Sequence, residues 1–219
     1  MKLRSIVLAG VIALAFAPAA FASSQADLTV TGTITPGACI PSLDGGGKID
    51  LGQIAAASLS ATDLTTLPSQ SITLSVHCPE AATFAIRAQD NRAGSSFATG
   101  GDGFFGLGAA PGGEKIGGYS LHVVSGSVTV DSASTAYGMS STDVGATWTH
   151  YGAGGTAAPG SNGVRIIAFA KTAGETTPSA IKDAAMTLQV SPMIVARSQL
   201  PTADEITIDG SATLEVVYL

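Results

Sequence analysis

The sequence predicts an all-β fold. Apolar residues recur at every second position in many short segments, a period that places them on one face of a strand. Helical patterns are nearly absent, because 27 glycines interrupt the chain and only 12% of its 219 residues are charged. Many short strands joined by turns rich in Gly and Ser are typical of a β-sandwich or a barrel.

The internal strands can be placed by this alternation. We expect them at residues 72–78, 84–88, 119–124, 127–130, 164–171, 186–190 and 205–208, with a shorter strand at 49–51. The first two are separated by Pro79 and are predicted to be neighbours joined by a turn. Residues 51–67 are ambiguous and leave room for a short helix.

Residues 90–118 contain ten glycines. This composition predicts a long surface excursion between strands, within one domain. A ligand site in this Gly-rich insertion is the alternative.

The first 22 residues have the pattern of an export signal. Lys2 and Arg4 give a basic start, an apolar run follows, and Ala20-Phe21-Ala22 forms a small-x-small cleavage site. We expect the mature chain to begin at Ser23. No later stretch approaches the ~20 apolar residues of a membrane-spanning helix, so we expect the exported chain to be soluble.

Removal of the signal leaves 197 residues, enough for one sizeable β domain with its own core. Both basic residues of the signal are lost, which leaves eight Lys and Arg against sixteen Asp and Glu, a net charge of −8. This acidic balance argues against nucleic acid as a partner.

Two alternating strands stand near the ends of the mature chain. The first carries its apolar face at Leu28, Val30, Gly32 and Ile34, with threonines on the other face. The second carries its apolar face at Ala212, Leu214, Val216 and Tyr218. A strand at a chain end needs a partner, so both segments are predicted to pair at sheet edges.

The chain has two cysteines, Cys39 and Cys78. An even number of cysteines in an exported chain predicts a disulfide. Thiol chemistry is the weaker alternative. The bridge would close a loop of roughly 40 residues and stabilise the fold by about 4 kcal/mol in the chain-entropy treatment.

Motifs for catalysis or cofactor binding are weak. Residues 101–106 match G-x-G-x-x-G, but they neither follow a clear strand nor open a helix, as a dinucleotide site requires. Residues 45–48 lack the spacing of a phosphate-binding loop. The three histidines, His77, His122 and His150, do not have the short spacing of a metal site. No G-x-S-x-G elbow occurs. We therefore predict a protein that is not an enzyme and that needs no metal or cofactor.

Two further groups of side chains have ordinary structural explanations. Asp204 and Glu205 are adjacent, so a strand would place them on opposite faces, which suits solvated charges better than an acid/base pair. Trp148 and Tyr151 could stack on a sugar, but core packing of Trp148 is the favoured interpretation.

Taken in order, these features resemble the subunits of chaperone-usher pili. The resemblance rests on the export signal, the alternating strand, residues 35–39 (Thr-Pro-Gly-Ala-Cys), a second cysteine about 40 residues later, and the C-terminal strand with Tyr218 penultimate. It frames nearly the whole mature chain, whereas residues 90–156 carry no such signature. The continuous alternating strand after the signal favours a shaft subunit over a tip adhesin.

The resemblance implies an incomplete immunoglobulin-like sandwich that is completed by a donor strand from a neighbouring subunit. Residues 23–36 would form the donor extension, with Leu28, Val30, Gly32 and Ile34 entering the groove of the next subunit and Gly32 at a position that accepts no side chain. Residues 37–219 would form the domain. Its strand with Leu214, Val216 and Tyr218 would line the groove and pair first with a chaperone.

The implied partners are copies of the chain or related subunits, a periplasmic chaperone and an outer-membrane usher. The implied destination is a fimbria on the cell surface, with a role in adhesion or biofilm formation. The alternative is an exported monomeric β-sandwich that binds a glycan or a protein.

Overall fold

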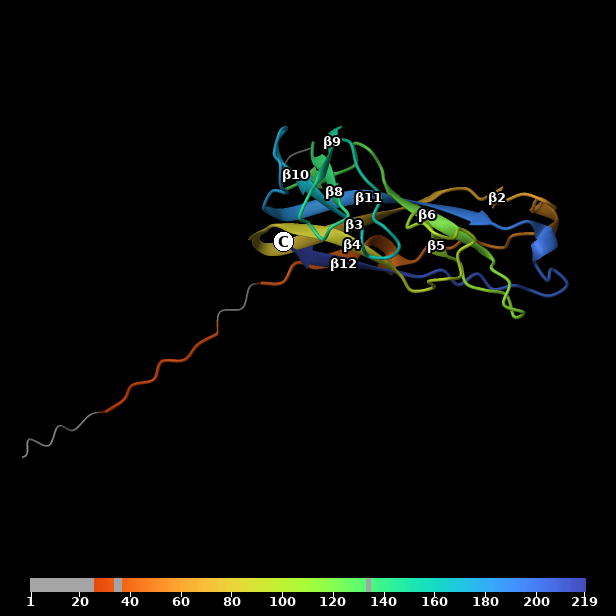
Figure 1. Cartoon of the computed structure of the whole chain (residues 1–219), viewed down its shortest axis with the longest axis horizontal. Coiled ribbons are helices and arrows are strands. Elements are labelled where there is room, and N and C mark those ends of the chain that lie inside the picture. The colour runs from red at the N-terminus through yellow and green to blue at the C-terminus, as the bar shows by residue number, and fades with distance from the viewer. Residues whose placement is uncertain (1–25, 34–36, 133–134) are drawn as a thin grey trace, which may run out of the picture. The chain divides into compact units, whose positions relative to one another are not determined.

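The computed structural model describes residues 26–33, 37–132 and 135–219 (Figure 1). The chain divides into two units, residues 1–35 and 36–219. In the first unit, residues 26–33 form neither helix nor strand, and the predicted signal at 1–22 lies outside the described residues. Among the described residues, no helix combines the length and apolar character needed to cross a membrane.

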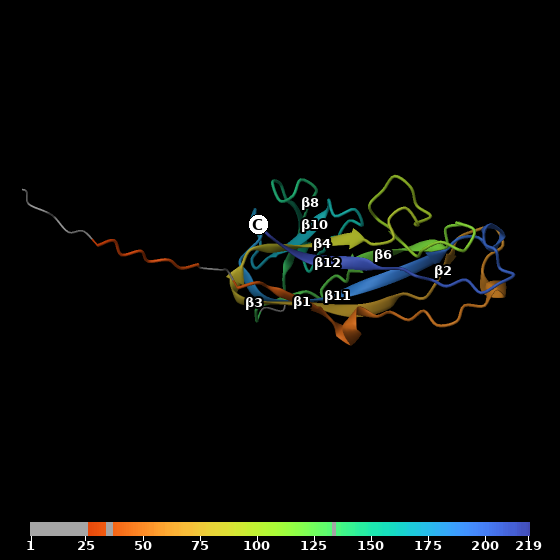
Figure 2. The same ribbon diagram turned by 90° about the horizontal axis from the view of Figure 1, so that it is seen from below.

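The second unit is built from two antiparallel sheets. The first contains, in spatial order, β1 (Ile40–Leu43), β3 (Gln70–Ala82), β11 (Ile181–Ile194), β6 (Gly117–Val123) and β5 (Phe105–Gly106), with β2 (Thr65–Thr66) and β7 (Thr129–Val130) also paired to β11. The second contains β12 (Ala212–Tyr218), β4 (Phe84–Asp90), β10 (Ile166–Ala170), β8 (Tyr137–Ser141) and β9 (Thr149–Ala153). Figure 2 shows β12 and β4 in one layer and β1, β3 and β11 in the other.

The strand order follows the immunoglobulin-like sandwich. The order β1-β3-β11-β6 corresponds to strands A-B-E-D, and β12-β4 corresponds to strands F-C. The predicted all-β sandwich is therefore confirmed. In such a sandwich a further strand, G, lies beside F. Within the described residues, no strand takes that place beside β12.

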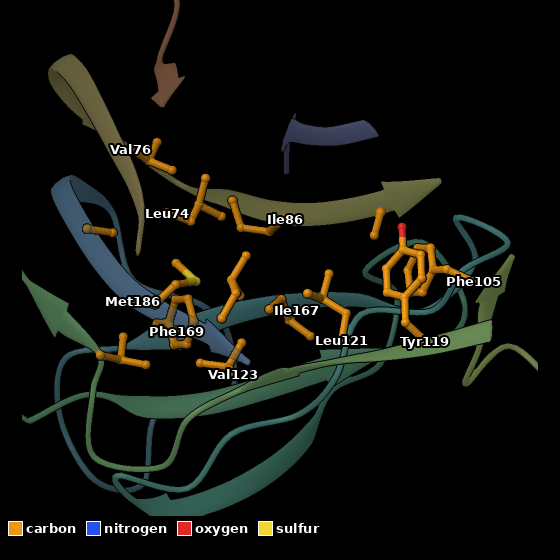
Figure 3. Close-up of a cluster of buried hydrophobic side chains, with 14 of the residues drawn as sticks. Leu74, Val76, Ile86, Phe105, Tyr119, Leu121, Val123, Ile167, Phe169 and Met186 are labelled. Atoms are coloured by element: carbon orange, nitrogen blue, oxygen red, sulfur yellow. The ribbon is translucent and has the colours of Figure 1, made fainter. Parts of the chain in front are cut away.

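The core lies between the two sheets because alternate side chains of both point inward. Leu74 of β3 and Met186 of β11 face Ile86 of β4 and Phe169 of β10, and all four are almost completely buried (Figure 3). On the outer face of the second sheet, Trp148 packs against a small cluster of Ala85, Ile166 and Ala168. This cover explains why every residue of β10 is buried.

Several predicted strands are present with different partners or bounds. β3 and β4 contain the predicted strands at 72–78 and 84–88, but they are not paired to each other, because the chain crosses between sheets at Thr83. Residues 49–51 and 205–208 are not assigned to strands. The ambiguous segment 51–67 contains only one 3₁₀ turn, Ala56–Ser58, and β2. The other 3₁₀ turns are Asp44–Gly47 and Arg197–Gln199.

The Gly-rich insertion differs most from its prediction, because its second half belongs to the core. Phe105 is fully buried, and Leu107 and Ile116 belong to the same hydrophobic cluster. A Cβ at position 106 would lie 2.6 Å from the carbonyl oxygen of Arg92. Glycine there permits close packing of two backbone segments.

Candidate functional site

The domain contains a large groove beside β12. The cavity has a volume of about 1000 Å³ and lies between two walls, formed by residues 47–56 after β1 and residues 200–214 leading into β12. Its floor comes from the sheet that contains β3, β11 and β6. The floor side chains are mainly aliphatic: Ile72, Leu121, Leu188, Val190 and Ile194.

The first wall is an extended segment whose backbone is largely unpaired. Within the described chain, residues 49–54 make no hydrogen bond between backbone groups, and the amide of Gly52 donates to Asp50 Oδ1 at 2.9 Å. Ile54 is half-buried and packs against the core. β1, which precedes this wall, is an edge strand, paired with β3 alone.

The second wall alternates as a strand does, although only its last residues, 212–214, belong to a strand ladder, that of β12 with β4. Ile206 and Ile208 are half-buried against the core, whereas Thr207 and Asp209 are exposed. The alternation continues in phase through Gly210 and Ala212 to Leu214. In the part of the chain that is described, residues 203–208 form no hydrogen bond with other backbone groups.

Ion pairs link this wall and β12 to β4 and to the residue Arg92 that follows it. Arg87 reaches Glu215 at 2.7 Å, and Arg92 reaches Asp209 at 2.6 Å. The amide of Asp209 donates to the carbonyl of Leu107, and the amide of Asn91 donates to the carbonyl of Ser211, both at 3.0 Å. Odd-numbered residues therefore turn their backbone groups inward to the sheet, so the even-numbered ones face the open edge.

Among the described residues, Tyr119 is the single aromatic residue that lines the groove. Its ring stacks on Phe105, with centroids 5.1 Å apart and planes 18° apart, and only 8% of the residue is exposed. Figure 3 shows its hydroxyl pointing away from β6 into the space between the sheets. No described residue accepts or donates a hydrogen bond at this hydroxyl. Burial, and then the charge of Asp90, raises the pKa of Tyr119, so the phenol keeps its proton.

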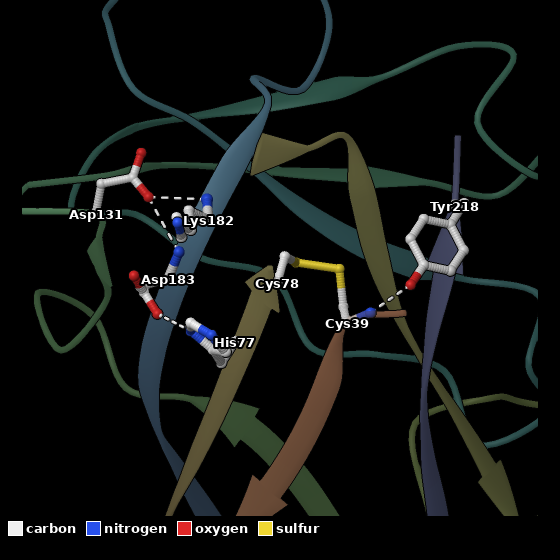
Figure 4. The surroundings of a disulfide bond; sticks show 7 residues. All are labelled: Cys39, His77, Cys78, Asp131, Lys182, Asp183 and Tyr218. Carbon is white, nitrogen blue, oxygen red and sulfur yellow. Dashed lines mark hydrogen bonds and ion pairs between the residues drawn. A yellow bond between two sulfur atoms is a disulfide. The ribbon is translucent and has the colours of Figure 1, made fainter. Parts of the chain in front are cut away.

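The disulfide predicted from the two cysteines is confirmed at one end of the domain. Cys39 and Cys78 are bonded, with 4.0 Å between their Cα atoms, so the residue before β1 is tied to β3 (Figure 4). The amide of Cys39 also donates to the hydroxyl of Tyr218 on β12. These contacts hold β1 and β12 together beyond the groove.

The predicted site residues are distributed unevenly. Leu214 lines the groove, and Val216 packs against the core beyond it. Tyr218 is half-exposed and does not line the groove. In the first unit, Leu28 is 90% and Val30 is 87% exposed, and the position of a Cβ on Gly32 is open. Ile34 lies outside the described residues.

Two parts of the groove were missed by the sequence prediction. Residues 47–56 were predicted to contain only a short strand at 49–51, because they carry few apolar residues in alternation. Residues 205–208 were predicted as an ordinary strand. The half-buried Ile206 and Ile208, which continue the alternation of β12, were the available indication.

The charged side chains of the described groove lining come from its two walls: Lys48, Asp50, Asp204 and Glu205. Among the described residues, no cluster of three His, Cys, Asp or Glu could hold a metal ion. Asp204 and Glu205 are exposed on the rim. His77 is exposed and bonds to Asp183 at 2.6 Å, on a face away from the groove lining (Figure 4). What the groove offers is an apolar floor between unpaired backbone segments.

Comparisons with known proteins give similarity without an activity. A family described as Protein of unknown function (DUF1120) matches residues 28–104, from the extension through β1, β3 and β4. "Protein GltF" of Escherichia coli (strain K12) is 29% identical in an alignment 239 residues long. The alignment covers 94% of this chain and 92% of that protein. "Uncharacterized protein YhcF" of the same strain is 28% identical over 231 residues, which cover 93% and 94%.

Proposed function

We propose that the protein is a structural subunit of a surface fimbria, assembled when the extension of one subunit enters the groove of the next. The observation that carries this proposal is the groove itself, which combines an apolar floor with two walls, at residues 49–54 and 203–208, whose backbone groups are unpaired within the described chain. This is the place of strand G in an immunoglobulin-like sandwich. An extended peptide that occupies such a place adds a strand to the sheet.

The extension has the length and pattern of a suitable strand. Residues 27–35 span roughly 30 Å when extended. Burial of Leu28, Val30 and Ile34 would contribute about 5 to 9 kcal/mol as an upper value. Each backbone hydrogen bond of the new ladder would add about 0.5 to 1.5 kcal/mol. The high exposure of Leu28 and Val30 leaves this apolar face available.

Assembly of this kind is head-to-tail and yields an open filament, because the donor and acceptor surfaces of one subunit differ. An empty apolar groove favours aggregation. The proposal therefore includes a periplasmic chaperone that covers the groove and an outer-membrane usher that receives the subunits. The protein acts by assembly, without catalysis or a cofactor, and the filament supports adhesion or biofilm formation.

The first test compares the mature protein with a variant lacking residues 23–35, both exported to the periplasm and purified. We expect filaments in electron microscopy and heat-resistant ladders on gels for the mature protein, and neither for the shortened variant. A synthetic peptide of residues 23–36, added to the shortened variant, should raise its Tm. Identical monomers and an unchanged Tm would favour a monomeric binding module.

A matched pair of substitutions tests the face of the extension. Val30→Asp would place a charge in the apolar groove, whereas Thr31→Asp would place it on the opposite face. We expect V30D to abolish filaments and T31D to retain them. Equal behaviour of the two variants would contradict insertion as an alternating strand.

A further inference from the structure

We propose that exposed apolar residues at one end of the domain form a second contact between neighbouring subunits, outside the groove. We call these residues the collar: Ile40, Val144, Tyr218 and Leu219. Their partner is the copy of the chain that receives the extension. This inference rests on the proposed function and adds a surface of the domain itself to the contact made by the extension.

The collar contains most of the exposed apolar side chains of the domain. Among the described residues of the second unit, six large apolar residues are exposed, and the two outside the collar are Leu64 and Val164. Ile40 is 63% exposed and Val144 is 70% exposed. Single exposed apolar residues are ordinary on a protein surface, but a group of them in one place marks an interaction site.

Hydrogen bonds place the collar at the end of the domain that contains the disulfide. The amide of Cys39, which precedes Ile40, donates to the hydroxyl of Tyr218 (Figure 4). The amide of Leu219 donates to the carbonyl of Thr83 at 3.1 Å, where the chain crosses from β3 to β4. The extension joins the domain at this same end, because residue 37 is the first described residue before Cys39.

Val144 completes the collar from a loop that holds it in an unfavourable conformation. Its φ is 59°, in the left-handed region that a β-branched residue rarely adopts. The carboxylate of Asp143 fixes the loop, since it accepts the amide and the hydroxyl of Thr147 at 2.9 and 2.6 Å and the hydroxyl of Ser141 at 2.6 Å. A Cβ at position 145 would lie 3.1 Å from Cδ2 of Leu219, so the loop also rests on the C-terminal residue. A strained residue that stays exposed indicates a role outside its own domain.

The length of the chain identifies the partner of the collar. Ile34 is the last apolar position of the extension, and Cys39 is fixed to β3 by the disulfide. The five residues from one to the other span at most about 18 Å. When the extension occupies a neighbour's groove, that neighbour therefore lies close to the collar, and contact between them removes the apolar side chains from water.

The partner is tested by photo-cross-linking in polymers of the full mature chain. A benzophenone amino acid at position 144 should link neighbouring copies, whereas the same group at position 164, exposed but outside the collar, should not. Equal linkage from both positions, or linkage from 144 to a chaperone in place of a second copy, would overturn the inference. Absence of polymers from the unsubstituted protein would instead overturn the proposed function.

The contribution of the collar is tested by Val144→Asp and Val144→Gly, both of which suit the positive φ better than valine does. Polymers of either variant should dissociate about tenfold faster than those of the unsubstituted chain, because the buried valine is lost. The Tm of the subunit should not fall, since relief of the strained φ acts in the opposite direction. Val164→Asp is the matched control and should leave dissociation unchanged.

A peptide separates the collar from the groove. A synthetic peptide of residues 23–36 carries no domain and therefore no collar, so it should bind equally well to the variant lacking residues 23–35 with and without Val144→Asp. Weaker peptide binding with Val144→Asp would show that position 144 acts through the groove and would overturn the inference. Unchanged dissociation of V144D and V144G polymers, or an equal increase in V164D, would overturn it as well.

Discussion

The second sheet has two edges, and they differ in what lies beneath them. At β9 the edge is exposed, since four of its five residues are solvent-accessible, and none of them lines the groove. At β12 the edge and the segment before it overhang the apolar groove. Both edges offer backbone groups, but only the β12 edge adds a floor that can bury the side chains of an incoming strand.

This difference shows why an open edge alone does not define a binding site. Each backbone hydrogen bond gained in water is worth only about 0.5 to 1.5 kcal/mol. Burial of three apolar side chains contributes several times more. Stable association of two subunits therefore needs apolar side chains at alternate positions of the incoming strand. It also needs an apolar floor under the edge that receives the strand.

The largest effect on assembly is expected from a charge in the groove. Ile208→Asp places a carboxylate where the inserted strand would bury it, so subunit association should weaken by about 2 to 4 kcal/mol, measured as the amount of heat-resistant polymer and by peptide binding. Thr207→Asp on the exposed face and Thr149→Asp on β9 are the matched controls, with little expected effect. An equal loss of polymer and of peptide binding in T149D would contradict the difference between the two edges.

The stability of the domain should depend on the disulfide. Cys39→Ala frees the residue before β1 from β3, and the entropy of the roughly 40-residue loop predicts a loss of about 4 kcal/mol in the free energy of unfolding. Unfolding in guanidinium should show the same loss for Cys78→Ala and for the double variant. A stability equal to that of the unsubstituted protein would contradict this role of the bridge.

The C-terminal strand and the disulfide show how far the sequence could predict the fold. The alternation of residues 212–218 predicted β12 within its observed bounds, because the strand covers a core on one face and meets solvent on the other. The disulfide was equally accessible from two cysteines in an exported chain. Local pattern and cysteine number are sufficient for such features.

The groove walls could not be predicted in the same way, because they depend on distant parts of the chain. Ile206 and Ile208 alternate as a strand would, yet they lack a ladder partner in the described chain. Their exposure to the cavity follows from the position of residues 47–56, far away in sequence. Tyr119 likewise lines the groove only in the folded chain, where Gly210, distant in sequence, lies close to its ring.

An intermediate effect is expected in the Gly-rich insertion, which supports the groove floor through Leu107. Gly106→Ala would force a Cβ to within 2.6 Å of the carbonyl oxygen of Arg92, so it should reduce the free energy of unfolding by about 1 to 3 kcal/mol. Gly101→Ala, in the same insertion but in open space, should change it by less than about 0.5 kcal/mol. Equal changes in the free energy of unfolding for the two variants would contradict the buried position of the second half of the insertion.

The smallest effect concerns a site that the groove does not touch. Asp131 follows β7 with φ of 50°. Its carboxylate lies 2.5 Å from Lys171 Nζ and accepts the amides of Lys182 and Asp183 at 2.8 and 3.0 Å (Figure 4). The hydrogen bond with Lys171, followed by that with Asp183, lowers the pKa of Asp131 from 3.8 to about 2.

Because this pKa is lower in the folded state, ionised Asp131 contributes stability that is present above about pH 4 and is lost as the pH falls toward 2. Asp131→Asn keeps an acceptor and tolerates the positive φ, but it removes the charge. Urea unfolding at pH 2 to 7 should show the unsubstituted protein more stable above pH 4, with the difference shrinking toward pH 2. The yield of polymer from Asp131→Asn should equal that of the unsubstituted protein. A loss of polymer as large as that expected for I208D would show that the surroundings of Asp131 are coupled to the groove.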